Sequence, residues 1–146
     1  MGKLKSFELD KSTMDMKLYR GDTASFWIHA VKKGGADWTE EDRMKFTVTG
    51  TDGSIVMKRH YRLDDQWDRG DGWVLIEFHN ADTENLSNGQ YTVEIRFYIG
   101  ATWDGTPGTE RCANALAPGA AQLIGGDDIK TAIHAALEIR NVYGED

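Results

Sequence analysis

The chain has 146 residues and a formal net charge of −7. A negative surface repels phosphate backbones and anionic lipid headgroups, so we expect neither a nucleic acid nor a membrane as partner. Hydrophobic residues make up 40% and charged residues 28% of the sequence, which excludes a mostly disordered chain. The length favours a single domain over residues 1–146, and no apolar run approaches the ~20 residues that span a bilayer.

Alternating apolar and polar residues predict strands along most of the chain, after an N-terminal arm at residues 1–13. The predicted strands cover residues 14–20, 24–31, 44–49, 55–63, 73–79, 91–99 and 129–142. Asp52-Gly53 between two of them is a strong hairpin signal. The last segment also fits an amphipathic helix, but its place at the end of a β pattern favours a strand.

About seven short strands predict an all-β fold, a two-sheet antiparallel β-sandwich. Sixteen glycines against two prolines agree with many tight turns. The residues expected on the inner faces of the sheets are Phe26, Ile28, Phe46, Val48, Val74, Ile76, Phe78, Tyr91, Val93, Ile95 and Phe97.

Residues 100–128 form a long glycine-rich insertion before the last strand. The segment contains six glycines and both prolines. It is too long for a plain hairpin link and has too few large apolar side chains to fold alone. We therefore expect it to be the main interaction element. The apolar groups that it can offer to a partner are Trp103, Leu116, Leu123 and Ile124.

The four histidines do not form a metal site. His29, His60, His79 and His134 lie on four different predicted segments, and no pair has ligand spacing. His29, His60 and His134 fall on strand faces opposite the core, so we expect solvated side chains there.

An acidic loop is a weak candidate for calcium. Asp64, Asp65, Asp68 and Asp71 supply the oxygen ligands that calcium prefers. The EF-hand pattern fails, however, because Arg69 stands at the glycine position and Leu75 at the final glutamate position. We expect weak or no calcium binding, no metal site and no cofactor.

No catalytic constellation is present in the sequence, so we expect no enzymatic activity. The single cysteine, Cys112, has no basic partner nearby except Arg111, and a nucleophile needs a positioned base. A lone cysteine also cannot form an internal disulfide, which fits assembly in a reducing compartment.

Five tryptophans allow two interpretations. They are Trp27, Trp38, Trp67, Trp73 and Trp103, and three of them lie in predicted loops or at loop borders. Such side chains close sandwich ends or anchor protein interfaces, and they can also stack on sugars. A carbohydrate-binding module, assisted by calcium at the acidic loop, is therefore the alternative function.

Three segments resemble one protein family. The first is Leu18-Tyr19-Arg20-Gly21-Asp22-Thr23 before an alternating strand. The second is Ala36-Asp37-Trp38-Thr39, similar to a glycine–x–proline/aspartate–Leu-Thr loop with Trp38 in place of the leucine. The third is Asp82-Thr83-x-x-Leu86-x-x-Gly89-x-Tyr91 before a long strand. Their order and spacing over about residues 14–99 resemble the immunoglobulin-like N-terminal domain of phage baseplate upper proteins and related prophage structural proteins.

The resemblance implies an immunoglobulin-like sandwich that works by protein–protein assembly in a phage or prophage tail or baseplate. Its expected partners are other phage structural proteins and further copies of itself, as a homo-oligomer. Its expected location is the virion, with assembly in the bacterial cytoplasm. The insertion and the alanine-rich end depart from the family pattern.

Overall fold

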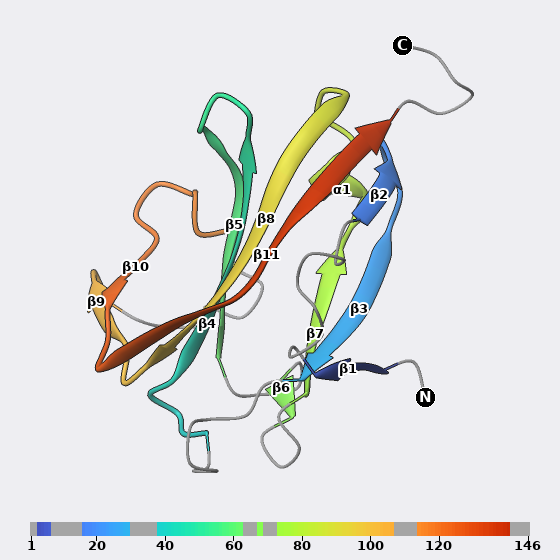
Figure 1. Cartoon of the computed structure of the whole chain (residues 1–146). Helices are drawn as coiled ribbons and strands as arrows, with labels where there is room; N and C mark the ends of the chain where they lie inside the picture. Colours follow the sequence, from blue (N-terminus) through green and yellow to red (C-terminus); the bar gives the residue numbers. More distant parts are fainter. Residues whose placement is uncertain are drawn as a thin grey trace.

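The computed structural model describes residues 3–6, 16–29, 38–62, 67–68, 73–106 and 114–140. In these segments the chain forms a five-stranded sheet, a four-stranded sheet and a separate two-stranded hairpin. The two larger sheets face each other, and the hairpin lies on the far side of the five-stranded sheet (Figure 1). The described part has no helix long and apolar enough to cross a membrane.

The five-stranded sheet is ordered β2 (Met16–Tyr19), β11 (Asp128–Arg140), β8 (Gly89–Ile99), β4 (Arg43–Gly50) and β5 (Ile55–Arg62). The four-stranded sheet is ordered β1 (Lys3–Ser6), β3 (Ala24–His29), β7 (Trp73–Phe78) and β6 (Trp67–Asp68). The hairpin consists of β9 (Thr102–Asp104) and β10 (Gln122–Gly125), and one short helix, α1 (Asn80–Thr83), follows β7.

The predicted all-β sandwich is confirmed, and each of the seven predicted strands has a counterpart in β2, β3, β4, β5, β7, β8 or β11. The ambiguous C-terminal segment is a strand, because β11 pairs antiparallel with β8 over most of its length. Two pairings differ from a purely antiparallel sandwich. β2 runs parallel to β11, and β1 runs parallel to β3, each at a sheet edge.

The core lies between the two large sheets, as the alternation predicts. Eight predicted core side chains are at most 3% exposed: Phe46, Val48, Val74, Ile76, Phe78, Val93, Ile95 and Phe97. Tyr91 is half-buried. The side chains of Phe26 and Ile28 are outside the described set, although their backbone positions pair with Ile76 and Val74.

The Asp-Gly hairpin joins β4 to β5 as predicted. Gly53 adopts a φ of 86°, which an L side chain rarely tolerates. The Gly50 amide donates to the Ser54 carbonyl at 2.8 Å, and the Asp52 carboxylate accepts from the Ser54 amide at 3.0 Å. This turn sets the register of β5, and therefore which of its side chains face inward.

Candidate interaction site

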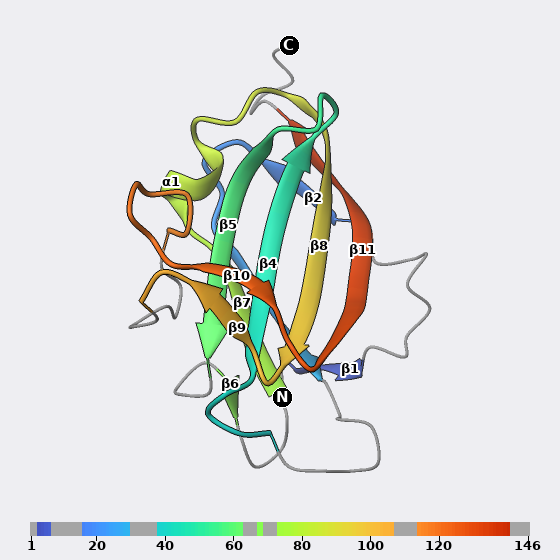
Figure 2. The same ribbon diagram turned by 90° about the vertical axis from the view of Figure 1, so that its left-hand side faces the viewer.

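Much of the described insertion folds back onto the chain. Leu123 of β10 pairs with Trp103 of β9 in an antiparallel hairpin. The hairpin lies across the outer face of β4 and β5 (Figure 2). The segment that precedes β10 also contacts β5, because the Ala115 amide donates to the Lys58 carbonyl at 2.9 Å. That bond satisfies part of the outer edge of β5, which would otherwise be open to pairing.

The four predicted interaction residues fall into two classes. Trp103 packs against its own chain, with its ring 5.4 Å from the His60 ring and 5.5 Å from the Arg43 guanidinium. Leu123 is only 7% exposed. Leu116 and Ile124, in contrast, are 44% and 65% exposed. The apolar surface that the described insertion leaves for a partner is therefore centred on Leu116 and Ile124.

His60 is not solvated, and that prediction is wrong. The residue is 2% exposed, because the β9–β10 hairpin covers the outer face of β5 at this position. Burial, and after it the charges of Lys58, Lys45 and Arg43, lower the pKa of His60 from 6.5 to about 4. His134 is exposed as predicted, His79 is exposed too, and the side chain of His29 is outside the described set.

The buried neutral His60 predicts a pH dependence of stability. As the pH falls below about 6.5, the unfolded chain takes up a proton at this imidazole, whereas the folded chain does so only near pH 4. The contribution of His60 to stability is thus complete above pH 6.5 and is lost between pH 6.5 and 4. Near pH 5 we expect about one proton to be taken up at His60 on unfolding.

Denaturant unfolding of the wild type and His60→Gln between pH 4 and 7 measures this effect. The wild type should lose more stability than the variant over that range, by a slope difference of about one proton. His134→Gln is the matched control, because His134 is exposed and should leave the slope unchanged. Parallel curves for the wild type and His60→Gln would contradict the burial of a neutral imidazole.

The structure brings no metal site together in its described part. No group of three or more His, Cys, Asp or Glu side chains that could hold a metal occurs there. Asp64, Asp65, Asp71 and Cys112 lie outside the described residues, and Asp68 is described only as backbone of β6.

Two of the loop tryptophans face protein rather than solvent. Trp38 is 8% exposed, and its ring centroid lies 5.2 Å from that of Phe97. Trp103 contacts His60 and Arg43, as described above. The side chain of Trp67 is outside the described set. Trp38 therefore closes one end of the core and is not available as a sugar platform.

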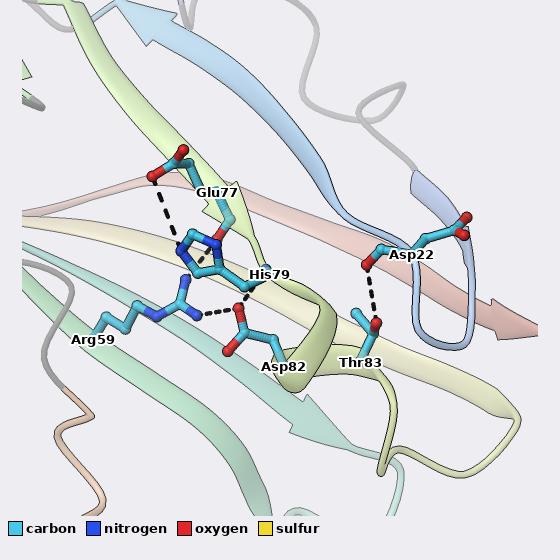
Figure 3. Close-up of polar contacts among 6 residues, drawn as sticks. All are labelled: Asp22, Arg59, Glu77, His79, Asp82 and Thr83. Carbon is cyan, nitrogen blue, oxygen red and sulfur yellow. Dashed lines mark hydrogen bonds and ion pairs between the residues drawn. The ribbon is translucent and has the colours of Figure 1, made fainter.

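Two of the three segments that carry the family resemblance meet in space. The buried Thr83 hydroxyl donates to the Asp22 carbonyl at 3.0 Å (Figure 3). It also accepts from the Gly21 amide at 3.0 Å. The Asn80 side chain donates to the Gly21 carbonyl at 2.7 Å. These bonds attach the turn after β2 to α1.

Arg59 connects the two sheets beside this junction. Its guanidinium extends from β5 to the end of β7, where it donates to the Glu77 carbonyl at 2.6 Å and pairs with the Asp82 carboxylate (Figure 3). Asp82 also accepts from the His79 amide at 2.6 Å. Sequence reasoning missed this connection. The available signal was an arginine on the otherwise apolar inward face of the predicted strand 55–63.

The third resemblance segment ends in a tyrosine tied to the backbone. The Tyr91 hydroxyl donates to the Ser87 carbonyl at 2.8 Å, and Gly89 between them has a φ of 141°. Leu86 packs against the core cluster. The Tyr91 bond and the packing of Leu86 therefore hold the connection between α1 and β8 in place.

Tyr91→Phe should lower the free energy of unfolding by about 0.5–1.5 kcal/mol, the net value of one hydrogen bond. Chemical denaturation measures the change. Tyr19→Phe is the control, because Tyr19 is 47% exposed and its hydroxyl should contribute nothing. An equal effect of the two changes would rule out a stabilising corner bond.

No protein-family model matches the chain, and no curated protein matches its sequence. Among solved structures the chain is similar to the N-terminal domain of phage TP901-1 ORF48. The sequence identity is 11%, the alignment covers 93% of each chain, and the TM-score is 0.49. The all-β class of the present chain is established by its own strand pairing.

Proposed function

We propose that this chain is a structural component of a phage or prophage tail or baseplate that acts through protein–protein assembly and has no enzymatic role. The main supporting observation is that two of the family-like segments meet in the folded chain. There the Thr83 hydroxyl forms hydrogen bonds with both Gly21 and Asp22. The second family-like segment contributes Trp38 to the core. The residues that carry the resemblance therefore help to hold this fold together, by hydrogen bonds between segments and by packing in the core.

The proposed assembly contact is the exposed apolar part of the insertion, Leu116 and Ile124. Isolated exposed apolar side chains are common on protein surfaces and alone do not mark an interface. Here the two side chains belong to one insertion that is anchored to β5 through Ala115 and Gln122. Anchoring reduces the ordering entropy that a free loop would lose on binding, which favours a contact at this place.

Purified virions or tail particles from the host that carries this gene test the proposal. Mass spectrometry of the particles should find the chain in a fixed ratio to other tail proteins, and labelling should place it in the tail or baseplate. Its absence from intact particles, while the cells express it, would exclude the proposed role.

The contact is tested in the same particles with a Leu116→Ser, Ile124→Ser variant. We expect this variant to fold normally and to be incorporated at a reduced level, because the lost apolar contacts are at the surface. Ile55→Ser is the matched control, because Ile55 is 42% exposed but lies beside the β4–β5 turn. Equal incorporation of both variants would show that the assembly contact does not involve Leu116 and Ile124.

A further inference from the structure

The described part of the insertion forms an arm that continues the ribbon of β8 and β11. These two strands stop pairing at Ile99 and Asp128, and β9 and β10 form a separate paired stretch beyond them. Between the two stretches the ribbon turns, so that the β9–β10 hairpin lies across the outer face of β4 and β5 (Figure 2). We call residues 102–106 and 114–125 the arm. It is an appendage that covers the five-stranded sheet, and it is not one of the strands of that sheet.

Two glycines lie where the ribbon turns into the arm. Gly100 has a φ of 61°, a conformation that L side chains rarely adopt. On the other strand, a Cβ atom at Gly126 would lie 2.9 Å from the Ile99 carbonyl oxygen. A few residues between two paired stretches can serve as a hinge, because their backbone dihedrals absorb a rotation of the segment that follows. The arm can therefore rotate away while β8 and β11 stay paired.

Few contacts hold the arm on the sheet. Besides the ring contacts of Trp103 described above, the Lys58 ammonium donates to the Gln122 side chain at 2.9 Å. Only Ala115 and Leu123 are buried among the described residues of the arm. The core between the two large sheets is far more extensive. Opening of the arm should therefore cost much less free energy than unfolding of the domain.

His60 lies under the arm in a site that suits only the neutral imidazole. A protonated imidazole donates from both ring nitrogens. The Nε2 atom of His60, however, is buried without a hydrogen-bond partner in the described part of the chain, in a residue that is 2% exposed. A proton added while the arm is closed thus leaves a buried donor unsatisfied, whereas water accepts from that donor once the arm has moved off.

The charges around His60 also oppose its protonation. Its ionisable neighbours on the outer face of β5, β4 and β8 are Lys58, Arg62, Arg43, Lys45 and Tyr98. Farther along β8, Arg96 already pairs with Glu94 at 3.7 Å. The described residues of the arm contribute one ionisable group, the exposed Asp104. Burial and the charges of Lys58, Lys45 and Arg43 together hold the pKa of His60 at about 4.

We propose that the arm is an acid-sensitive cover: it opens as a unit from β5 and β4, and protonation of His60 promotes this opening while the sandwich stays folded. The open arm returns the imidazole to water and to its ordinary pKa of 6.5. The preference for the closed arm is therefore greatest above pH 6.5 and weakens as the pH falls toward 4. With these two pKa values, opening should be about twentyfold more frequent at pH 5 than at pH 7.

Opening would also change what the protein presents to a partner. Leu116 and Ile124 move with the arm, and the Lys58 carbonyl at the edge of β5 loses its bond from the Ala115 amide. An assembly contact through Leu116 and Ile124 would then be sensitive to acid, a consequence that rests on the proposed function. The opening of the arm itself does not depend on that proposal.

Hydrogen exchange of the full-length chain at pH 7 and pH 5 tests the proposal, with mass spectrometry as readout and a correction for the intrinsic pH dependence of exchange. In peptides from residues 114–125 the protection should fall about twentyfold between the two pH values. Low concentrations of urea should barely change exchange in these peptides, because opening of the arm exposes little surface. Peptides from β8 should respond to urea, because they exchange through global unfolding.

Three variants identify the group that takes up the proton. His60→Gln should remove the pH dependence, because glutamine has a similar size and takes up no proton in this range. His134→Gln is the matched control and should keep the twentyfold effect, because His134 is exposed. Lys45→Gln removes one nearby positive charge and should reduce the effect without abolishing it. This last variant provides the test if His60→Gln disturbs the packing under the arm.

Three results would overturn the proposal. The first is an arm that exchanges only together with the core, which would make it a fixed part of the domain. The second is arm protection that stays the same at pH 7 and pH 5. The third is a pH effect that persists in His60→Gln. None of these results depends on whether phage particles incorporate the chain, so this proposal and the proposed function can fail separately.

Discussion

Truncating Phe46 to alanine is expected to lower the free energy of unfolding by about 3–5 kcal/mol. Phe46 on β4 is fully buried, and its ring meets the ring of Phe78 on β7 edge-on, with centroids 5.5 Å apart. The two strands belong to different sheets. The truncation therefore opens a void at the interface between the sheets, in addition to the lost transfer free energy of the ring.

Urea unfolding followed by tryptophan fluorescence measures this loss. Phe78→Ala should cost a similar amount, and the double variant should cost less than the sum, because each single change already removes the shared contact. Ile55→Ala is the control. Ile55 is 42% exposed on the neighbouring strand, so its truncation should cost less than about 0.5 kcal/mol. A small loss for Phe46→Ala would mean that the two sheets do not pack face to face as described.

Periodicity predicted the sandwich because its inner strand faces are buried between two sheets. Val93 and Ile95 alternate with Glu94 and Arg96, and the structure buries the first pair and leaves the second pair on the outer face. Periodicity alone left the last segment open between strand and helix, and its place at the end of a β pattern favoured the strand that the structure shows. Ala135, Leu137 and Ile139 repeat every second residue, and all three are buried in β11.

Periodicity failed where a segment distant in sequence covers the other face of a strand. His60 alternates with inward residues, so the pattern assigns it to solvent. The β9–β10 hairpin, more than forty positions later, buries it instead. Neither the length nor the glycine content of residues 100–128 specifies which strand such an insertion will cover. The bonds that Ala115 and Gln122 form with Lys58 fix that placement.

The candidate site was predictable only in part, for the same reason. Leu116 and Ile124 were identified by their apolar character in a polar insertion, whereas the burial of Leu123 depends on tertiary packing. The cover over the outer face of β5 was not visible in the linear sequence, because Trp103 and His60 become neighbours only in the folded chain.

Replacing Asp82 by alanine is the second change with a large expected effect, about 3–5 kcal/mol, because it leaves a buried guanidinium without its counter-ion. The side chains of Arg59 and Asp82 are 7% and 19% exposed. Burial lowers the pKa of Arg59, but the hydrogen bond with Asp82 and the neighbouring charges raise it by more, so the pKa ends above its ordinary value. Arg59 stays charged even when Asp82 is removed, because a guanidinium keeps its proton at any pH at which the protein is folded.

Asp82→Asn separates the charge from the hydrogen bond. Asparagine can still accept from the His79 amide, which Asp82 does at 2.6 Å, but it cannot neutralise Arg59. We expect Asn to retain about 1 kcal/mol relative to Ala, and both variants to remain clearly less stable than the wild type. Glu84→Ala, at an exposed position just after α1, is the control and should change stability by less than about 0.5 kcal/mol.

The double variant Arg59→Met, Asp82→Ala decides whether the ion pair or the packing of its carbon chains holds the sheets together. If the cost of Asp82→Ala comes from the uncompensated charge, removing that charge as well should restore part of the stability, because methionine fills most of the volume without needing a counter-ion. Losses that simply add in the double variant would show that Arg59 and Asp82 act independently. The connection of β5 to the other sheet would then depend on the bond from Arg59 to the Glu77 carbonyl of β7.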